Sequence, residues 1–144
     1  MSIPQSAHGR AVLVMHEALS HGLHGTAARL ELHDGGPDRL ARVALRGWLD
    51  AIALDRLERR FEDLARRGVT CLLLDLSGVQ HVDYRLVPTL AAALSRFEAQ
   101  AGVAIVCGLS SYLRDIFRLA GCESRLRCWP SSAELIESTR ELAS

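Results

Sequence analysis

Hydrophobic and polar residues alternate along two early stretches of the chain, Ala28–Leu32 and Arg39–Gly47. A period of two is typical of a β-strand that buries one of its faces. The residues between the two stretches read HDGGPD, a combination that favours a turn. We therefore predict a β-hairpin with a long connecting loop.

Helical spacing follows the hairpin. Leucine and phenylalanine recur three and four residues apart from Leu54 to Leu64, which predicts a helix with one apolar stripe. Asp50 is suited to the N-cap of this helix, and Gly68 is suited to its C-terminal end. The same reasoning predicts a second helix that Asp83 caps and a third helix that Ser110 caps.

Two continuous apolar runs, Val69–Leu76 and Val103–Gly108, precede the second and third helices and predict central strands covered on both faces. The tripeptide SGV after the first run predicts a turn, and RLRCW predicts a short last strand. Ser131 and Glu134 match a capping box, which predicts a final helix. This alternation implies an α/β fold, with a mostly parallel central sheet begun by the β-hairpin and with about four helices.

The first 26 residues do not fit this alternation. We expect them to form an N-terminal extension, either a flexible tail or one short helix over AVLVMHEALSHGLHG, next to a domain that spans residues 27–144. The stretch holds three histidines whose spacing gives no metal-binding face on one helix: His16, His21 and His24. We therefore predict a solvated or partner-packed segment without a metal.

The composition narrows the class of protein. A chain of 144 residues fits one domain, and a hydrophobic content of 49% supports a packed core. Seventeen basic and 17 acidic side chains balance, which argues against bulk attraction to nucleic acid or to an anionic membrane. No run approaches the ~20 apolar residues of a membrane span, so we expect a cytoplasmic protein without membrane insertion. The four cysteines form no CxxC pair, which predicts free thiols and no bound cofactor.

Sequence motifs for catalysis are missing. The chain contains no GxGxxG, no phosphate loop, no GxSxG and no HExxH. His81 and Asp83 lie two residues apart, but nothing in the sequence provides a group on which such a pair could act. We predict no catalytic residues and therefore a protein that is not an enzyme.

Four blocks of the sequence follow the order and spacing of one known family. They are RVALRGWLD, VTCLLLDLSGVQHVD, VAIVCGLSSYLRDIFRLAG and CWPSSAELIES. The chain from about Ala28 onward resembles the STAS domain, the fold of bacterial anti-sigma factor antagonists and of the cytoplasmic tails of sulfate transporters.

The resemblance implies a protein that works by binding. In the antagonists, the loop before the second helix docks on a kinase-type anti-sigma factor. That partner phosphorylates a Ser or Thr directly after the loop's Asp, and the added charge of about −2 breaks the interface. Asp83 matches this Asp, and the acceptor position falls on Tyr84. The expected partner-binding residues are Asp83, Tyr84, Arg85, Val87 and Ser77.

The junction also departs from the family pattern. Relatives have Ser or Thr after the Asp and glycines further on, whereas this chain reads DYRLVP from Asp83 to Pro88. We therefore expect a regulator of transcription that binds its partner without Ser/Thr switching. Tyr84 is then either a partner contact or itself a phosphorylation site, and Ser77 is either a turn residue or a modified one. Alternative functions are a small-ligand-sensing or nucleotide-sensing STAS domain and a subunit of a transporter or larger complex, and a homodimer is a further possibility.

Overall fold

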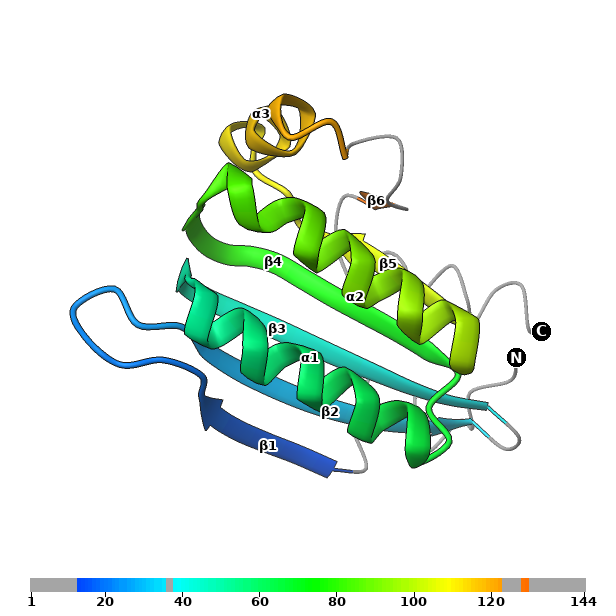
Figure 1. Cartoon of the computed structure of the whole chain (residues 1–144). Helices are drawn as coiled ribbons and strands as arrows, with labels where there is room; N and C mark the ends of the chain where they lie inside the picture. Colours follow the sequence, from blue (N-terminus) through cyan, green and yellow to red (C-terminus); the bar gives the residue numbers. More distant parts are fainter. Residues whose placement is uncertain (1–12, 36–37, 123–127, 130–144) are drawn as a thin grey trace.

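A six-stranded sheet forms the centre of the molecule in the computed structural model, which describes residues 13–35, 38–122 and 128–129 (Figure 1). The strands lie side by side in the order of the sequence. They are β1 (Leu13–Ala18), β2 (Ala27–Gly35), β3 (Asp38–Leu49), β4 (Cys71–Val82), β5 (Val103–Cys107) and β6 (Cys128–Trp129). The first three strands run antiparallel to one another, and β3 to β6 run parallel. The α/β class and the initial β-hairpin are thus confirmed.

Strand β1 lies in the segment for which the sequence predicted a flexible tail or a short helix, and both predictions are wrong for Leu13–Ala18. Leu13 to Ala18 pair with β2 in antiparallel register, from Leu13 opposite Leu32 to Ala18 opposite Ala27. The connection from β1 to β2 also joins the core, because Leu19 is 1% exposed and Thr26 is 1% exposed. The edge of the β-hairpin offers unpaired backbone groups, and this long-range pairing satisfies them.

Three α-helices and one 3-10 turn complete the described part of the chain. They are α1 (Ala51–Arg66), η2 (Tyr84–Leu86), α2 (Val87–Gln100) and α3 (Ser111–Leu119). The predicted caps are confirmed at two of them: Asp50 accepts a hydrogen bond from the Ala53 amide at 2.7 Å, and Ser110 accepts one from Leu113 at 3.1 Å. The helix predicted after Ser131 lies outside the described residues.

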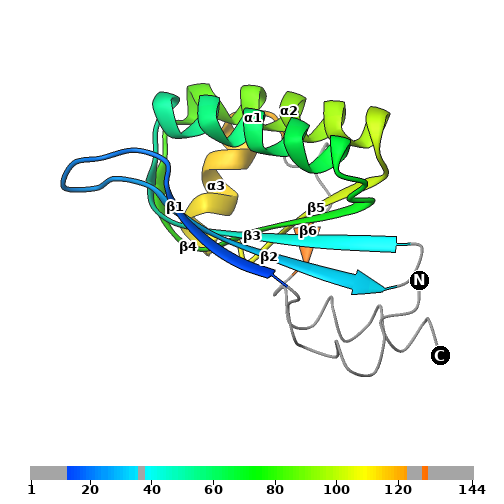
Figure 2. The same cartoon turned by 90° about the horizontal axis from the view of Figure 1, so that it is seen from below.

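Helices α1 and α2 cover one face of the sheet (Figure 2). The core fills the space between this face and the helices with close-packed leucine and phenylalanine side chains. A fully buried side chain of this size contributes ~1.5–3 kcal/mol to folding. The largest fully buried members are Leu19, Leu45, Leu54, Leu57, Leu64, Leu72, Leu74, Leu76, Phe97 and Phe117.

Strand β4 is longer than predicted. It continues through Ser77, Gly78 and Val79, so the SGV turn is wrong, and it ends only at Val82. A register shift against β3, between Ala44 and Arg46, accommodates these residues. A bulge of this kind lets turn-forming residues remain in a strand. The strand thereby reaches directly to the junction that the sequence singled out.

Candidate functional site

The chain between β4 and α2 forms a compact polar turn. Asp83 is the N-cap of η2, where its carboxylate accepts a hydrogen bond from the Arg85 amide at 2.9 Å. The Arg85 guanidinium also returns to this carboxylate, with Nη2 at 2.7 Å from Oδ2 and Nε at 3.1 Å from both oxygens. Between them the Tyr84 ring is 50% exposed. The turn therefore presents an aromatic ring beside a closed ion pair.

This ion pair fixes the charge of the turn. The side-chain hydrogen bond from Arg85, followed by the backbone hydrogen bond from the same residue, lowers the pKa of Asp83 from 3.8 to about 2. The hydrogen bond with Asp83 in turn raises the pKa of Arg85 above its ordinary value. Both groups are consequently charged over the whole physiological range of pH.

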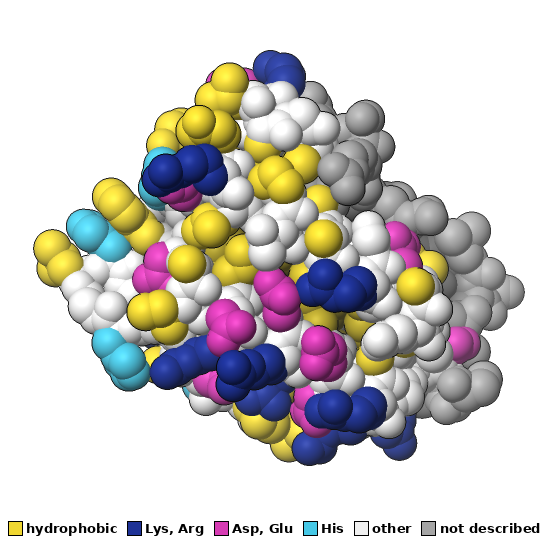
Figure 3. Space-filling view, viewed as in Figure 1, with side chains coloured by type: hydrophobic (Ala, Val, Ile, Leu, Met, Phe, Trp, Pro, Cys, Tyr) yellow, Lys and Arg dark blue, Asp and Glu magenta, His cyan; other side chains and the backbone are white. Residues whose placement is uncertain are grey.

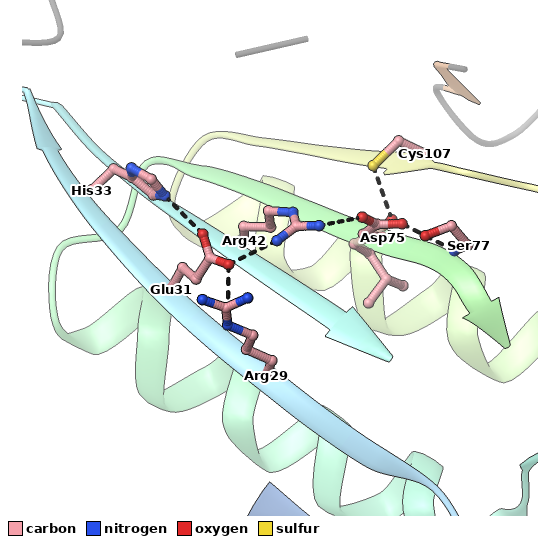
Figure 4. A network of polar contacts seen from close by, with 8 residues as sticks. Arg29, Glu31, His33, Arg42, Asp75, Ser77 and Cys107 are labelled. Carbon is pink, nitrogen blue, oxygen red and sulfur yellow. Dashed lines mark hydrogen bonds and ion pairs between the residues drawn. The ribbon is translucent and has the colours of Figure 1, made fainter. Parts of the chain in front are cut away.

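Two of the five expected partner-binding residues lie elsewhere. Val87 is 0% exposed and belongs to the hydrophobic core, so the structure does not present its side chain to a partner. Ser77 is exposed, but it follows Asp75 on the sheet face opposite α1 and α2 (Figure 4). Side chains two residues apart on a strand share a face, which accounts for this placement. Asp83, Tyr84 and Arg85 stay together at the turn.

A row of rings that the sequence analysis missed lies next to this turn. His24 stacks on Trp48 with ring centroids 4.2 Å apart, and Trp48 contacts His81 at 5.1 Å. His81 Nδ1 lies 2.6 Å from the Tyr112 hydroxyl. We call these four residues the aromatic row. Each comes from a different segment: the β1–β2 connection, the end of β3, the end of β4 and the start of α3.

The aromatic row and the polar turn form one surface. Trp48 is 41% exposed and Tyr112 is 52% exposed. His81 is close enough to Asp83 for its charge to affect that carboxylate, and α3 contacts η2. Figure 3 shows hydrophobic and histidine side chains along the left edge, from the β1–β2 connection to the start of α3. We refer to Asp83, Tyr84, Arg85 and the aromatic row together as the mouth surface.

Backbone contacts hold the β1–β2 connection against the end of β3. Gly47 adopts a φ of +93°, and a Cβ atom there would lie 2.2 Å from the Gly25 carbonyl oxygen. The β1–β2 connection therefore crosses β3 in close contact, and the Trp48 amide donates to the His24 carbonyl at 3.0 Å. The Thr26 hydroxyl donates to the Trp48 carbonyl from the other side of this crossing. These contacts bring His24 over Trp48.

A second group of charged side chains lies on the face of the sheet that α1 and α2 do not cover (Figure 4). Arg42 lies between two carboxylates, with Nη1 at 2.7 Å from Glu31 and Nη2 at 2.7 Å from Asp75. Burial of Arg42 disfavours its charge, but hydrogen bonds and charges of Asp75 and Glu31 outweigh burial, so its pKa is raised. His33 lies 3.3 Å from Glu31, and its buried Nδ1 atom has no hydrogen-bond partner among the residues that the structure describes. We call Glu31, His33, Arg42 and Asp75 the sheet network.

Metal ligands do not assemble in the described ranges: no group of three or more His, Cys, Asp or Glu side chains there could hold an ion. No disulfide joins Cys71, Cys107 and Cys122 to one another. Burial, followed by the charge of Asp38, raises the pKa of the Cys71 thiol to about 11. Within residues 13–122, apart from the gap at 36–37, none of the helices has the length and apolar content needed to cross a membrane.

Comparison with known proteins gives the family. The model of the STAS domain matches residues 36–135, so the chain belongs to the STAS domain family. A search of curated proteins gave no match.

Solved structures agree with this assignment. An anti-sigma factor antagonist from Mycobacterium paratuberculosis is similar with a TM-score of 0.67 and 21% identity, over 85% of this chain and 99% of that chain. Unphosphorylated SpoIIAA, the Bacillus cell fate determinant, gives a TM-score of 0.61 and 20% identity, over 78% and 96% of the two chains. A variant of Moorella thermoacetica RsbS gives 0.61 and 15%, over 79% and 97%. At these identities the matches establish the fold.

Proposed function

We propose that this STAS domain is a non-catalytic regulator of the anti-sigma antagonist type that binds a protein partner through its mouth surface. The observation that carries this proposal is the half-exposed Tyr84 ring, at the position that the resemblance matches to the phospho-acceptor of the antagonists. It lies beside the Asp83–Arg85 pair and the aromatic row, in a protein whose family includes anti-sigma factor antagonists.

The residue types of the mouth surface support protein binding. Tyrosine, tryptophan and arginine are the side chains that most often dominate the affinity of protein interfaces. Here Trp48 is held between His24 and His81, and Tyr112 is held by His81. Rings that are already ordered lose little conformational freedom on association. The surface therefore suits a partner that brings apolar groups and a complement to the fixed charges of Asp83 and Arg85.

The partner that fits the family is a kinase-type anti-sigma factor, and the proposed setting is the cytoplasm. Tyr84 places its hydroxyl at the end of a rigid ring, several ångströms farther from the backbone than the hydroxyl of serine. A kinase that transfers phosphate to a short side chain at this position does not reach the same atom here. We therefore propose binding without Ser/Thr switching at the mouth surface.

This proposal is tested by phosphorylation. The chain is incubated with ATP and a kinase-type anti-sigma factor from the same organism, and phosphate is located by mass spectrometry. We expect a stable complex and no phosphoserine or phosphothreonine within residues 77–90. A Tyr84→Ser variant serves as the matched control, because it restores a short hydroxyl side chain to the junction. Phosphate on Ser77 or Thr89 of the native chain would contradict the proposal.

A further inference from the structure

A cavity of about 490 Å³ opens on the sheet face that carries the sheet network. Small side chains form its floor, and polar side chains form its rim. The floor residues are Ala18, Ala27 and Ala44, and the rim residues are His16, Arg29, Arg46 and Ser77. Volumes of 300–1,000 Å³ are typical of small-molecule sites, so the cavity has the size of a binding pocket.

The strand register explains the hollow. His16, Arg29 and Ala44 lie opposite one another on β1, β2 and β3. Ala18, Ala27 and Arg46 form the next row on the same face. Two long basic side chains, one from each row, thus flank a patch of alanines. The small alanine side chains leave a hollow, and the longer side chains around them enclose it.

The basic side chains around the cavity outnumber the neighbouring carboxylates, because Arg29, Arg42 and Arg46 face only Glu31 and Asp75. Glu31 already accepts from Arg42 at 2.7 Å, and Asp75 accepts from Arg42 at 2.7 Å and from the Ser77 amide at 2.9 Å. Arg29 reaches Glu31 only at 3.4 Å and is half exposed.

Two further residues complete the electrostatics of the cavity. Arg46 is exposed, and no residue within the described ranges forms an ion pair with it. Glu17 lines the cavity, but its carboxylate pairs with Arg60 of α1 at 2.9 Å and therefore points to the other face. The cavity consequently has cationic donors on its rim and no unpaired carboxylate from Glu17, Glu31 or Asp75.

We infer that this cavity binds a small organic anion: one carboxylate or phosphate group joined to a compact apolar body. The anionic group contacts Arg46 and Arg29, whose planar guanidinium groups match the geometry of such oxygens. The Ser77 hydroxyl adds a neutral donor at the same rim. The apolar body covers the alanine floor, from which it removes water. This ligand site is separate from the mouth surface and does not depend on the proposed function.

The inference is tested by titrating the isotope-labelled full chain with sodium octanoate and following its amide signals by NMR. Octanamide is the matched neutral probe, and inorganic phosphate is the matched anion without an apolar body. We expect saturable shifts centred on His16, Arg29, Arg46 and Ser77 with octanoate. Octanamide and phosphate each supply half of the required chemistry, so we expect both to bind at least tenfold more weakly. Equal shifts with octanoate and octanamide, or shifts centred on the mouth surface, would overturn the inference.

Two variants separate charge from shape. Arg46→Ala removes one charge-assisted contact and is expected to weaken octanoate binding about tenfold. Ala27→Leu keeps every charge but fills the floor, and it is expected to abolish binding. Arg59→Ala, which removes an exposed arginine of α1, is the control and leaves the affinity unchanged. A well-dispersed amide spectrum confirms that each variant is folded. Native-like affinity in both Arg46→Ala and Ala27→Leu would refute the site.

Discussion

Two arginine–carboxylate pairs in this molecule have the same shortest distance but different surroundings. Arg42–Asp75 and Arg85–Asp83 both measure 2.7 Å. Arg42 joins neighbouring strands, and the Asp75 side chain is 5% exposed. Arg85 pairs with a residue only two positions away in the sequence, and 76% of its side chain is exposed. Distance alone therefore says little about what an ion pair does.

The difference lies in burial. A buried carboxylate has lost its hydration, so removing its partner leaves an uncompensated charge in the protein. An exposed carboxylate regains water when its partner is removed. We therefore assign the sheet network to structure and the Asp83–Arg85 pair to recognition, where exposed charge and a fixed shape are needed.

We expect the largest loss of stability when Arg42 is replaced. Arg42→Met leaves Glu31 and Asp75 without their shared cation, and we expect the free energy of unfolding to fall by about 3 kcal/mol. Urea unfolding at neutral pH measures this value. Arg59→Ala, which breaks only the exposed pair with Asp55, is the control and should change stability by less than ~0.5 kcal/mol. A similar small change in both variants would contradict the structural role of the sheet network.

We expect a smaller loss of stability from a substitution at Gly47, where the β1–β2 connection crosses β3. Gly47→Ala combines a left-handed backbone with a clash against Gly25, and we expect a loss of ~1–3 kcal/mol. Gly22→Ala is the matched control, because Gly22 also has a positive φ but has no atom near its Cβ position. The indole N–H signal of Trp48 should shift in Gly47→Ala and stay unchanged in Gly22→Ala. Equal stability of the two variants would refute the close crossing.

The smallest effect on stability is expected at the mouth surface. Arg85→Met should leave the melting temperature unchanged within error, because both partners remain hydrated. The pKa of Asp83 should instead rise from about 2 towards its ordinary 3.8, which NMR titration of its carboxylate measures.

The sign of this pH effect is fixed by the direction of the shift. The pKa of Asp83 is lower in the folded protein than in the unfolded chain, so the ion pair stabilises the fold fully at pH values above the unfolded pKa of 3.8. This stabilisation is lost as the pH falls through about 2. An unshifted Asp83 pKa in the native chain would contradict the ion pair.

Local sequence signals predicted most of the fold. Asp50 and Ser110 were found because an N-cap needs an acceptor immediately before a helical apolar stripe. Strand β1 was missed because its six residues show little periodicity and its partner, β2, follows only after a connection of eight residues without a recognisable hairpin turn. The SGV turn was wrong for a similar reason: the bulge against β3 keeps Ser77 in a strand.

The candidate site was only partly predictable. Asp83, Tyr84 and Arg85 are consecutive, so their association follows from one turn. Val87 was assigned to the partner surface by its place in the family motif, although it lies three residues before Leu90 in an apolar stripe with helical spacing that indicates a core position. The aromatic row comes from four distant segments and has no local signature. One available signal was Trp48, a large aromatic side chain in the block RVALRGWLD.

The most direct test of the central claim is the affinity of the native chain and of Tyr84→Ala for the kinase-type anti-sigma factor, measured by titration calorimetry. Loss of a central aromatic side chain should weaken binding at least tenfold. Leu119→Ala is the control, because it removes a side chain that is 73% exposed at the other end of α3. We predict a loss of affinity in Tyr84→Ala alone. Native affinity in Tyr84→Ala would contradict the assignment of the mouth surface as the docking site.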